Sequence, residues 1–429
     1  MDEHNFEEKE ELDFPKKKRG FGKGVAAGIL GTIVTLTLVI VIGCKLTGTS
    51  IVLSLGNSSS TTKSSSILDA DTVAKINELK AYIDLYYYED DDIDEDTLRD
   101  SLYAGLIDGI GDKYSVYYNA QEYEDLKIST TGEYYGIGAG LKQDPDTMVV
   151  TISKVYEGTP SEEAGLMADD IITSVDGTDA TTMEVSELVQ LIRGEEGTTV
   201  HLEILRPSTG ETLSFDVERA NVQLPSVTYE MLNDKVGYIY LQQFESGTAD
   251  QFETAVNELT EQGMEALVLD VRYNPGGMVT SVVQILDDIL PEGTVVYTED
   301  KNGNRQDYTS DAEHYMDIPI AVLINGDSAS ASEILAGAIK DYNYGTLIGT
   351  TTFGKGIVQS IFDLEDGDAL KLTTAKYFTP NGNYIHGVGI DPDIELEYEY
   401  TGDADADYDK AYDNQIQKAI EVLDGQLAE

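Results

Sequence analysis

Two short runs of this sequence consist almost wholly of apolar residues, and they restrict the fold more than any other feature. One covers Ala266–Val271 (ALVLDV), and the other covers Ile320–Asn325 (IAVLIN). A strand that is apolar throughout is expected where helices cover both faces of a sheet. Segments with helical spacing alternate with the runs, at 248–263 and 279–290, and a further helical pattern follows the serines after the second run. This alternation predicts an α/β core, a mixed sheet flanked by helices in which these strands run parallel.

Other regions of the chain have different residue patterns. Residues 132–220 alternate short strands with glycines, and only Thr182–Gly194 has helical spacing, which predicts a small inserted β-rich domain. Residues 67–131 precede it as a helical region, because apolar residues recur at helical intervals after Ile67 and again after Leu98. The α/β core then covers residues 221–400. An acidic tail that ends in a helix covers residues 401–429.

The N-terminus predicts a membrane anchor. Gly24–Gly43 carries no charge and is long enough to cross a bilayer as a helix, and a basic cluster lies within the preceding residues 1–23. Since positive charge remains on the cytoplasmic side, the N-terminus is expected in the cytoplasm and the rest of the chain outside. Cys44 ends a run (VIGC) that resembles a bacterial lipobox, so cleavage with lipidation of Cys44 is the alternative to an uncleaved single-pass anchor. Residues 44–66 read as a flexible stalk rich in Ser and Thr.

Charge and cysteine content exclude several classes of function. The formal net charge is 28 − 80 = −52, so nucleic acid is not expected as a partner. Cys44 is the only cysteine, which rules out an intramolecular disulfide and a cysteine-based zinc site. The acidic run Tyr88–Thr97 lacks the glycine of a calcium loop and predicts a solvated loop.

A serine-rich segment follows the second apolar run. Ile324–Asp341 (INGDSASASEILAGAIKD) places Ser328, Ser330 and Ser332 between a strand and a helix. Unpaired amides at the start of a helix can stabilise an oxyanion, so each of these serines could be a nucleophile. One of them could equally cap the helix. No histidine lies close in sequence to serve as the base.

Two further segments add possible partners for a serine nucleophile. Lys355 lies between two glycines in Thr351–Ser360 (TTFGKGIVQS), with Gln359 four residues later. A lysine can act as a base only when burial away from carboxylates keeps it largely neutral. The third segment, Leu269–Val279 (LDVRYNPGGMV), makes a sharp turn whose glycine amides could point at a substrate carbonyl. Taken alone, each of these features is also compatible with an ordinary loop.

Together, the three segments resemble the carboxyl-terminal processing peptidases, serine proteases with a Ser–Lys dyad. The resemblance runs from about Val73 to Glu395 and includes Ile385–Glu395 (IHGVGIDPDIE). It implies that Ser330 is the nucleophile, Lys355 the general base and Gln359 the residue that steadies the lysine. Ser328 and Ser332 are then structural.

The resemblance also implies an oxyanion hole and an acyl-transfer mechanism. Its donors are the amides of Gly276 and Ala331, with Gly277 as the less favoured glycine. Lys355 takes the proton of Ser330, the serine attacks a peptide carbonyl, and water releases the acyl-enzyme. No metal and no cofactor are implied.

The β-rich domain resembles a PDZ domain. Tyr134–Leu141 (YYGIGAGL) resembles its carboxylate-binding loop, which implies that Tyr135, Gly136, Ile137 and Gly138 bind the C-terminus of a substrate. Glu157–Gly177 resembles the middle of such a domain. The expected partners are therefore proteins or peptides with accessible C-termini. The resemblance further implies that the domain gates the active site, and Arg193 is a candidate for the coupling residue.

Two departures from the family pattern concern the site. Asp327 lies three residues before Ser330, where its carboxylate near Lys355 would oppose the lysine's role as base. Tyr273 occupies a turn position that is often small. Two other functions stay open: a tethered PDZ adaptor on a silent protease scaffold, and an esterase or amidase with the same dyad. The apolar faces of the N-terminal helices also allow self-association of the chain.

Overall fold

The computed structural model describes residues 67–89, 93–145, 147–311, 313, 315–403 and 406–428. The predicted anchor Gly24–Gly43, the stalk and Cys44 lie outside these residues. No helix within the described ranges is long and apolar enough to span a bilayer. The described residues 67–89 belong to one compact unit, and those from Ile93 onward form a second.

The predicted N-terminal helices are confirmed. α2 (Ala70–Tyr86) lies in the first unit and starts where the Asp69 carboxylate accepts a hydrogen bond from the Thr72 amide. The second unit begins with α3 (Glu95–Asp108), β1 (Val116–Tyr118) and α4 (Ala120–Thr131). No residue of α2 or α3 is buried. Self-association through these helices stays a prediction, which the molar mass in solution would decide.

The β-rich domain is present as expected. Its six-stranded sheet has the order β3-β4-β5-β7-β8, with β6 paired to β5, and β2 pairs with β9 in a separate two-stranded sheet. The strands are β2 (Glu133–Gly136), β3 (Ala139–Gln143), β4 (Val150–Val155), β5 (Ile171–Val175), β6 (Thr178–Asp179), β7 (Thr199–Arg206), β8 (Glu211–Glu218) and β9 (Ala220–Gln223), with helices α5 (Pro160–Ala164) and α6 (Val185–Ile192). The helix predicted within Thr182–Gly194 is therefore α6.

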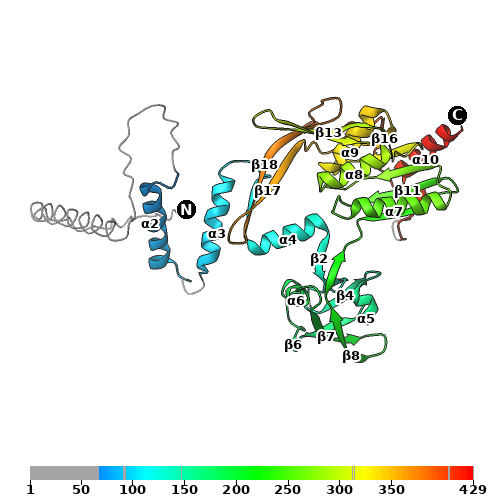
Figure 1. Cartoon of the computed structure of the whole chain (residues 1–429). Coiled ribbons are helices and arrows are strands. Elements are labelled where there is room, and N and C mark those ends of the chain that lie inside the picture. The colour runs from blue at the N-terminus through cyan, green and yellow to red at the C-terminus, as the bar shows by residue number, and fades with distance from the viewer. Residues whose placement is uncertain are drawn as a thin grey trace, which may run out of the picture. The chain divides into compact units, whose positions relative to one another are not determined.

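The α/β core is built on a sheet of order β10-β11-β12-β15-β16-β19 (Figure 1). Only β10 is antiparallel to its neighbour, so the predicted parallel strands in a mixed sheet are confirmed. The strands are β10 (Val227–Met231), β11 (Val236–Leu241), β12 (Ala266–Asp270), β15 (Ile320–Ile324), β16 (Gly345–Gly349) and β19 (Ile394–Glu395), and the helices are α7 (Thr248–Glu261), α8 (Val279–Ile289), α9 (Ala331–Tyr342), η2 (Lys410–Tyr412) and α10 (Asn414–Leu427).

Helices on both faces explain the two apolar runs. Alternate residues of β12 and β15, such as Leu269 and Val322, belong to the cluster formed with α7, α8 and α9. The intervening residues, such as Val268 and Ala321, pack with Leu423 and its neighbours on α10. Every residue of both strands is buried. The C-terminal helix is thus a layer of the core.

A buried ion-pair network holds α10 against the end of β12. The Arg272 guanidinium donates to Asp270, to Asp413 Oδ2 (2.9 Å) and to Gln415 Oε1 (2.8 Å). The Tyr238 hydroxyl also donates to Asp270, at 2.8 Å. Because Arg272 directly precedes the turn at Tyr273, this network fixes one end of that turn.

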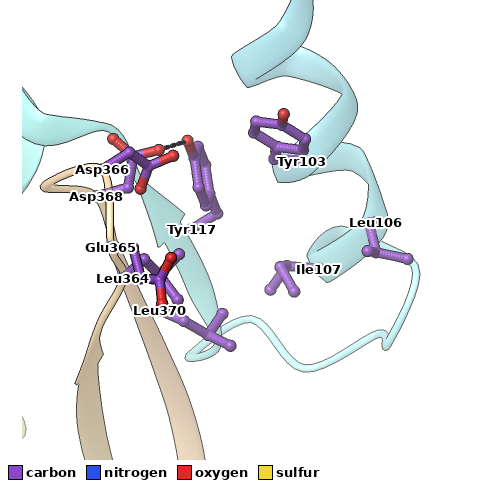
Figure 2. Close-up of a pocket in the computed structure, with 9 residues that line it drawn as sticks. All are labelled: Tyr103, Leu106, Ile107, Tyr117, Leu364, Glu365, Asp366, Asp368 and Leu370. Carbon is purple, nitrogen blue, oxygen red and sulfur yellow. Dashed lines mark hydrogen bonds between the residues drawn. The ribbon is translucent and has the colours of Figure 1, made fainter. Parts of the chain in front are cut away.

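A second, antiparallel sheet has the order β1-β18-β13-β14, with β17 paired to β18. It contains β13 (Gly293–Asp300), β14 (Arg305–Ser310), β17 (Ile357–Asp363) and β18 (Ala369–Phe378). Figure 1 shows β17 and β18 as a long hairpin. A cavity of about 540 Å³ lies between its tip, β1 and α3 (Figure 2). None of the predicted site residues lines this cavity.

Candidate active site

Ser330 lies on a strained turn at the start of α9. Its φ of 56° is in a region that residues other than glycine rarely adopt. The strain is held from both sides: the Ser330 amide donates to Glu333 Oε2 (2.9 Å), and the Ser330 carbonyl accepts from the Tyr377 hydroxyl (3.1 Å). Such strain persists only where surrounding contacts enforce it, as at functional sites.

The hydroxyls of the two neighbouring serines are used inside the core. Ser328 Oγ donates to the Val271 carbonyl at 2.8 Å, and Ser332 Oγ donates to the Asn274 carbonyl at 2.9 Å. Both residues are fully buried. Ser330 is partly exposed, and among the described residues its side chain is paired only with the Glu333 amide, in the capping box at the start of α9. Of the three serines, Ser330 is therefore the one whose hydroxyl is not bonded to a carbonyl inside the core.

Glu333 joins the serine turn to the loop that carries Lys355. One carboxylate oxygen, Oε2, accepts the amides of Ser330 (2.9 Å) and Lys355 (2.8 Å). The other, Oε1, accepts the Thr352 hydroxyl (2.6 Å) and the Gly354 amide (2.7 Å). Glu333 is completely buried. One carboxylate thus sets the spacing between the two predicted catalytic residues through their backbones.

The environment of Lys355 favours its neutral form. Burial lowers the pKa of its amine, and the positive charges of Lys371 and Lys113 lower it further, while Glu333 opposes them. The amine lies 5.1 Å from the centroid of the Tyr114 ring. It donates no hydrogen bond to any described residue, Ser330 included. The structure therefore brings the loop of Lys355 close to the loop of Ser330. The hydrogen bond through which Ser330 would pass its proton to the lysine is not formed.

The carboxylate of Asp327 does not act on the lysine. Asp327 is exposed, and its amide donates to Asn325 Oδ1 at 3.1 Å. The carboxylate that raises the pKa of Lys355 is Glu333. The departure from the family pattern at Asp327 therefore does not oppose a role of Lys355 as a base.

Gln359 lies on β17 near the lysine loop. Its Nε2 atom donates to Thr373 Oγ1 at 3.4 Å, and no hydrogen bond connects it with Lys355. A role in steadying the amine therefore stays a prediction.

The glycine turn packs directly against the serine. A Cβ atom at Gly276 would lie 2.7 Å from Ser330 Cβ and 2.9 Å from the Ala331 nitrogen, closer than real Cβ contacts allow. Only glycine fits there. At the same turn Tyr273 has a φ of 63° and is 58% exposed, so its side chain lies on the surface beside the site.

The amides near Ser330 differ in their availability. The Gly276 amide donates to Asn274 Oδ1 at 2.8 Å. The amides of Gly277 and Ala331 make no hydrogen bond to any described residue. In this conformation the free donors beside Ser330 are thus the amides of Ala331 and Gly277. Gly276 is the predicted oxyanion donor in preference to Gly277. For its amide to serve in this way, its hydrogen bond to Asn274 must break when substrate binds.

The predicted carboxylate-binding loop borders an apolar hollow in the β-rich domain. Tyr135 and Gly136 end β2, Ile137 is buried, and Gly138 has a φ of 79° that glycine adopts readily. A hollow of about 260 Å³ lies between β3 and α6, lined by apolar side chains such as Ile137, Leu141, Val185, Val189 and Ile192. Its chemistry suits an apolar C-terminal side chain.

Arg193 lies at the end of α6 beside this hollow. Its guanidinium lies 5.5 Å from the centroid of the Tyr134 ring and 3.6 Å from Asp125 Oδ1 on α4. Arg193 therefore contacts both the β-rich domain and the helix that leads into it. Within the described part of the chain, no cluster of His, Cys, Asp and Glu side chains could hold a metal ion.

Comparisons with known proteins identify relatives of both regions. Residues 235–396 match peptidase family S41, and residues 151–206 match a PDZ domain. A carboxyl-terminal-processing protease of Synechocystis sp. is 40% identical over 277 residues, which cover 64% of this chain and 65% of that protein. A protein of the same name from Picosynechococcus sp. is 36% identical over 302 residues, 69% of this chain and 73% of its own length. These matches span about two thirds of the relatives' lengths.

Among solved structures, the photosystem II D1 C-terminal processing protease is 28% identical and aligns with a TM-score of 0.43. The alignment covers 77% of this chain and 94% of that one.

Replacing Glu333 tests its part in this site. Glu333→Gln keeps the size of the side chain but turns one accepting oxygen into a donor, which leaves two buried donors without acceptors. Each such donor costs about 1–3 kcal/mol. We therefore expect the free energy of unfolding to fall by about 2 kcal/mol or more, measured by urea unfolding of the chain from Ile67 onward.

The matched control is Glu253→Gln on the exposed face of α7. It should change the free energy of unfolding by no more than about 0.5 kcal/mol. Equal stability of the two variants would show that the Glu333 carboxylate does not hold the two loops together.

Proposed function

The chain belongs to peptidase family S41, the carboxyl-terminal processing serine peptidases, and from this we propose that it is a membrane-anchored endopeptidase with a Ser330–Lys355 dyad. The observation that carries the proposal is the partly exposed Ser330 on a strained turn, tied through Glu333 to a lysine whose pKa is lowered. All the groups that the chemistry needs are present, which argues against a silent scaffold.

The proposed reaction is acyl transfer. Neutral Lys355 accepts the proton of Ser330 Oγ as that oxygen bonds to the carbonyl carbon of the substrate. The oxyanion receives the Ala331 amide and a glycine amide of the turn. The lysine then protonates the leaving amine, and water, deprotonated by the same lysine, releases the acyl group. In this structure the lysine lies apart from the serine, so substrate binding must complete the dyad.

We propose that substrates are recruited by their C-termini. Backbone amides of the segment Tyr135–Gly138 would hold the terminal carboxylate, and the apolar hollow would take the last side chain. The bound peptide would add as a strand to β3. Proteins with accessible apolar C-termini are therefore the proposed substrate class.

The proposed location is the outer face of a cell membrane. Its support is the sequence alone: the uncharged segment Gly24–Gly43 follows a basic cluster. The full chain should stay in the membrane fraction after alkaline carbonate extraction, whereas full release would exclude an integral anchor.

Substitution of the dyad tests the reaction. Ser330→Ala and Lys355→Ala should each lower kcat/KM for an unfolded protein with an apolar C-terminus by about 10²–10⁴-fold. Lys301→Ala, in the exposed turn between β13 and β14, is the matched control and should retain full activity. Fragments are read by mass spectrometry. Cleavage that survives either dyad substitution would exclude the mechanism. If the parent chain and its Lys301→Ala control both bind the tail but do not cleave the protein, the alternative function as a tethered PDZ adaptor would be favoured.

The pH profile tests the role of the lysine separately. Since the base must be neutral, the rate should rise with pH and level off above the pKa of Lys355. Lys371→Met removes a positive charge that lowers this pKa. The pKa of Lys355 should then rise, and the part of the pH–rate curve where the rate increases should move to higher pH. Lys376→Met, at the exposed residue of β18, is the control. A pH–rate curve that does not move in Lys371→Met would contradict the assignment.

A binding assay tests tail recognition. Val189→Asp places a carboxylate in the apolar hollow and should weaken binding of a peptide with an apolar C-terminus by about tenfold or more. Gln190→Asp adds the same charge on the exposed side of α6 and should bind normally. Fluorescence anisotropy on a Ser330→Ala background prevents cleavage. Equal affinity of both variants would exclude this hollow as the tail site.

A further inference from the structure

One short segment of the core contacts both chain connections to the PDZ-like domain. We call residues 243–247, between β11 and α7, the junction loop. On the connection that enters the domain, the Gln243 side chain donates to the Ser129 carbonyl (2.8 Å) and the Ser246 amide donates to the Thr131 carbonyl (3.1 Å). These contacts fix the junction loop to the end of α4.

The connection that leaves the domain reaches the same loop. A Cβ atom at Gly247 would lie only 1.2 Å from Nε2 of Gln223, the last residue of β9, so that side chain occupies the space that glycine leaves open. The Leu224 amide donates to the Gly132 carbonyl at 2.9 Å and ties the two connections together. A displacement of the domain therefore acts on the junction loop from both connections.

The other side of the junction loop holds the glycine turn of the active site. The Phe244 amide donates to the Gly276 carbonyl (2.9 Å), and the Phe244 carbonyl accepts the Met278 amide (2.7 Å). Phe244 is fully buried. Phe244 alone thus lies between the glycine turn beside Ser330 and Glu245, which follows Phe244 in the junction loop.

Glu245 is the unusual member of the loop. Its Oε2 atom is buried without a hydrogen-bond partner among the described residues, and a Cβ atom at Gly132 would lie 2.0 Å from it. Burial alone raises the pKa of Glu245, to about 6. The titratable group of the facing connection, Glu133, accepts a hydrogen bond from Ser246 Oγ at 2.7 Å and does not contribute to this shift.

We infer that the junction loop transmits the position of the PDZ-like domain to the glycine turn, and that Glu245 is the positioning residue that sets its contact with Gly132. The inference rests on the proposed function. An ionised carboxylate without a partner disfavours the buried contact, whereas the protonated acid does not. Because its pKa is raised in the contact, the contact is favoured as pH falls below about 6 and weakened above it.

The observed conformation is the one in which Glu245 contacts Gly132 and the Gly276 amide is held by Asn274. Release of the contact would free the junction loop, and with it the Gly276 carbonyl that the Phe244 amide holds. A bound tail that moves the domain and a rise in pH should therefore both favour the active turn.

The test uses the full chain with Glu245→Gln, a neutral residue of the same size, and Glu253→Gln as the control. Cleavage of a short peptide is measured from pH 5 to 8, with and without a separate apolar tail peptide. We expect basal kcat/KM of Glu245→Gln to be several-fold lower than that of the parent at pH 7.5 and closer to it at pH 5. The added tail should raise it more strongly. Unchanged basal rates and unchanged stimulation would overturn the inference.

Hydrogen exchange gives a readout that does not depend on cleavage. At one fixed pH, the tail peptide should speed exchange in residues 274–278 of the Ser330→Ala chain, and Glu245→Gln should slow this exchange before the tail is added and so enlarge the tail's effect. Equal changes in both chains would also overturn the inference. Absence of cleavage by the parent chain would instead count against the proposed function, and exchange would still test the junction loop.

Discussion

The arrangement of this site depends on one buried carboxylate. Glu333 accepts four hydrogen bonds, from the Ser330, Gly354 and Lys355 amides and from the Thr352 hydroxyl. These donors come from two loops that are more than twenty residues apart in sequence and that end different strands. A buried acceptor with this many donors is stable only if every donor stays in place, so it specifies one geometry. The unusual backbone of Ser330 and the position of Lys355 are both consequences of this contact.

The core around the site provides the rigidity that this contact needs. β12 and β15 are buried on both faces, so their ends are held rigidly in the sheet. The turns that follow these strands therefore start from fixed positions. The ends of parallel strands in α/β sheets are where such sites form, and here the glycine turn follows β12 while Ser330 follows β15. Arg272 adds a second anchor because its buried ion pair joins the glycine turn to α10. The helix α10 thus supports the turn that packs against Ser330.

The sequence could predict what depends on local pattern. The two apolar runs, the parallel strands and the helix after Ser330 follow from composition and spacing alone. Glu333 was also accessible, since it stands three residues after Ser330 in the Ser-x-x-Glu pattern of helix starts. The role of α10 was not accessible: its contact between Asp413 and Arg272 joins residues far apart in the chain, and acidic residues near a C-terminus usually indicate a solvated tail. The same limit applies to Gln223 and Glu245, whose positions depend on how two domains meet.

The three groups of the proposed reaction are close but not yet engaged with one another. Asn274 cannot easily yield the Gly276 amide by moving itself, because its Nδ2 donates to the Leu241 carbonyl and its carbonyl accepts from Ala329 and Ser332. The turn must therefore move at the glycines, whose backbones are the most permissive there. The Gly276 carbonyl is bonded to Phe244, so that motion passes through the junction loop. The inferred control of the proposed oxyanion donors by the PDZ-like domain therefore acts through the glycines, the one part of the turn that is free to change.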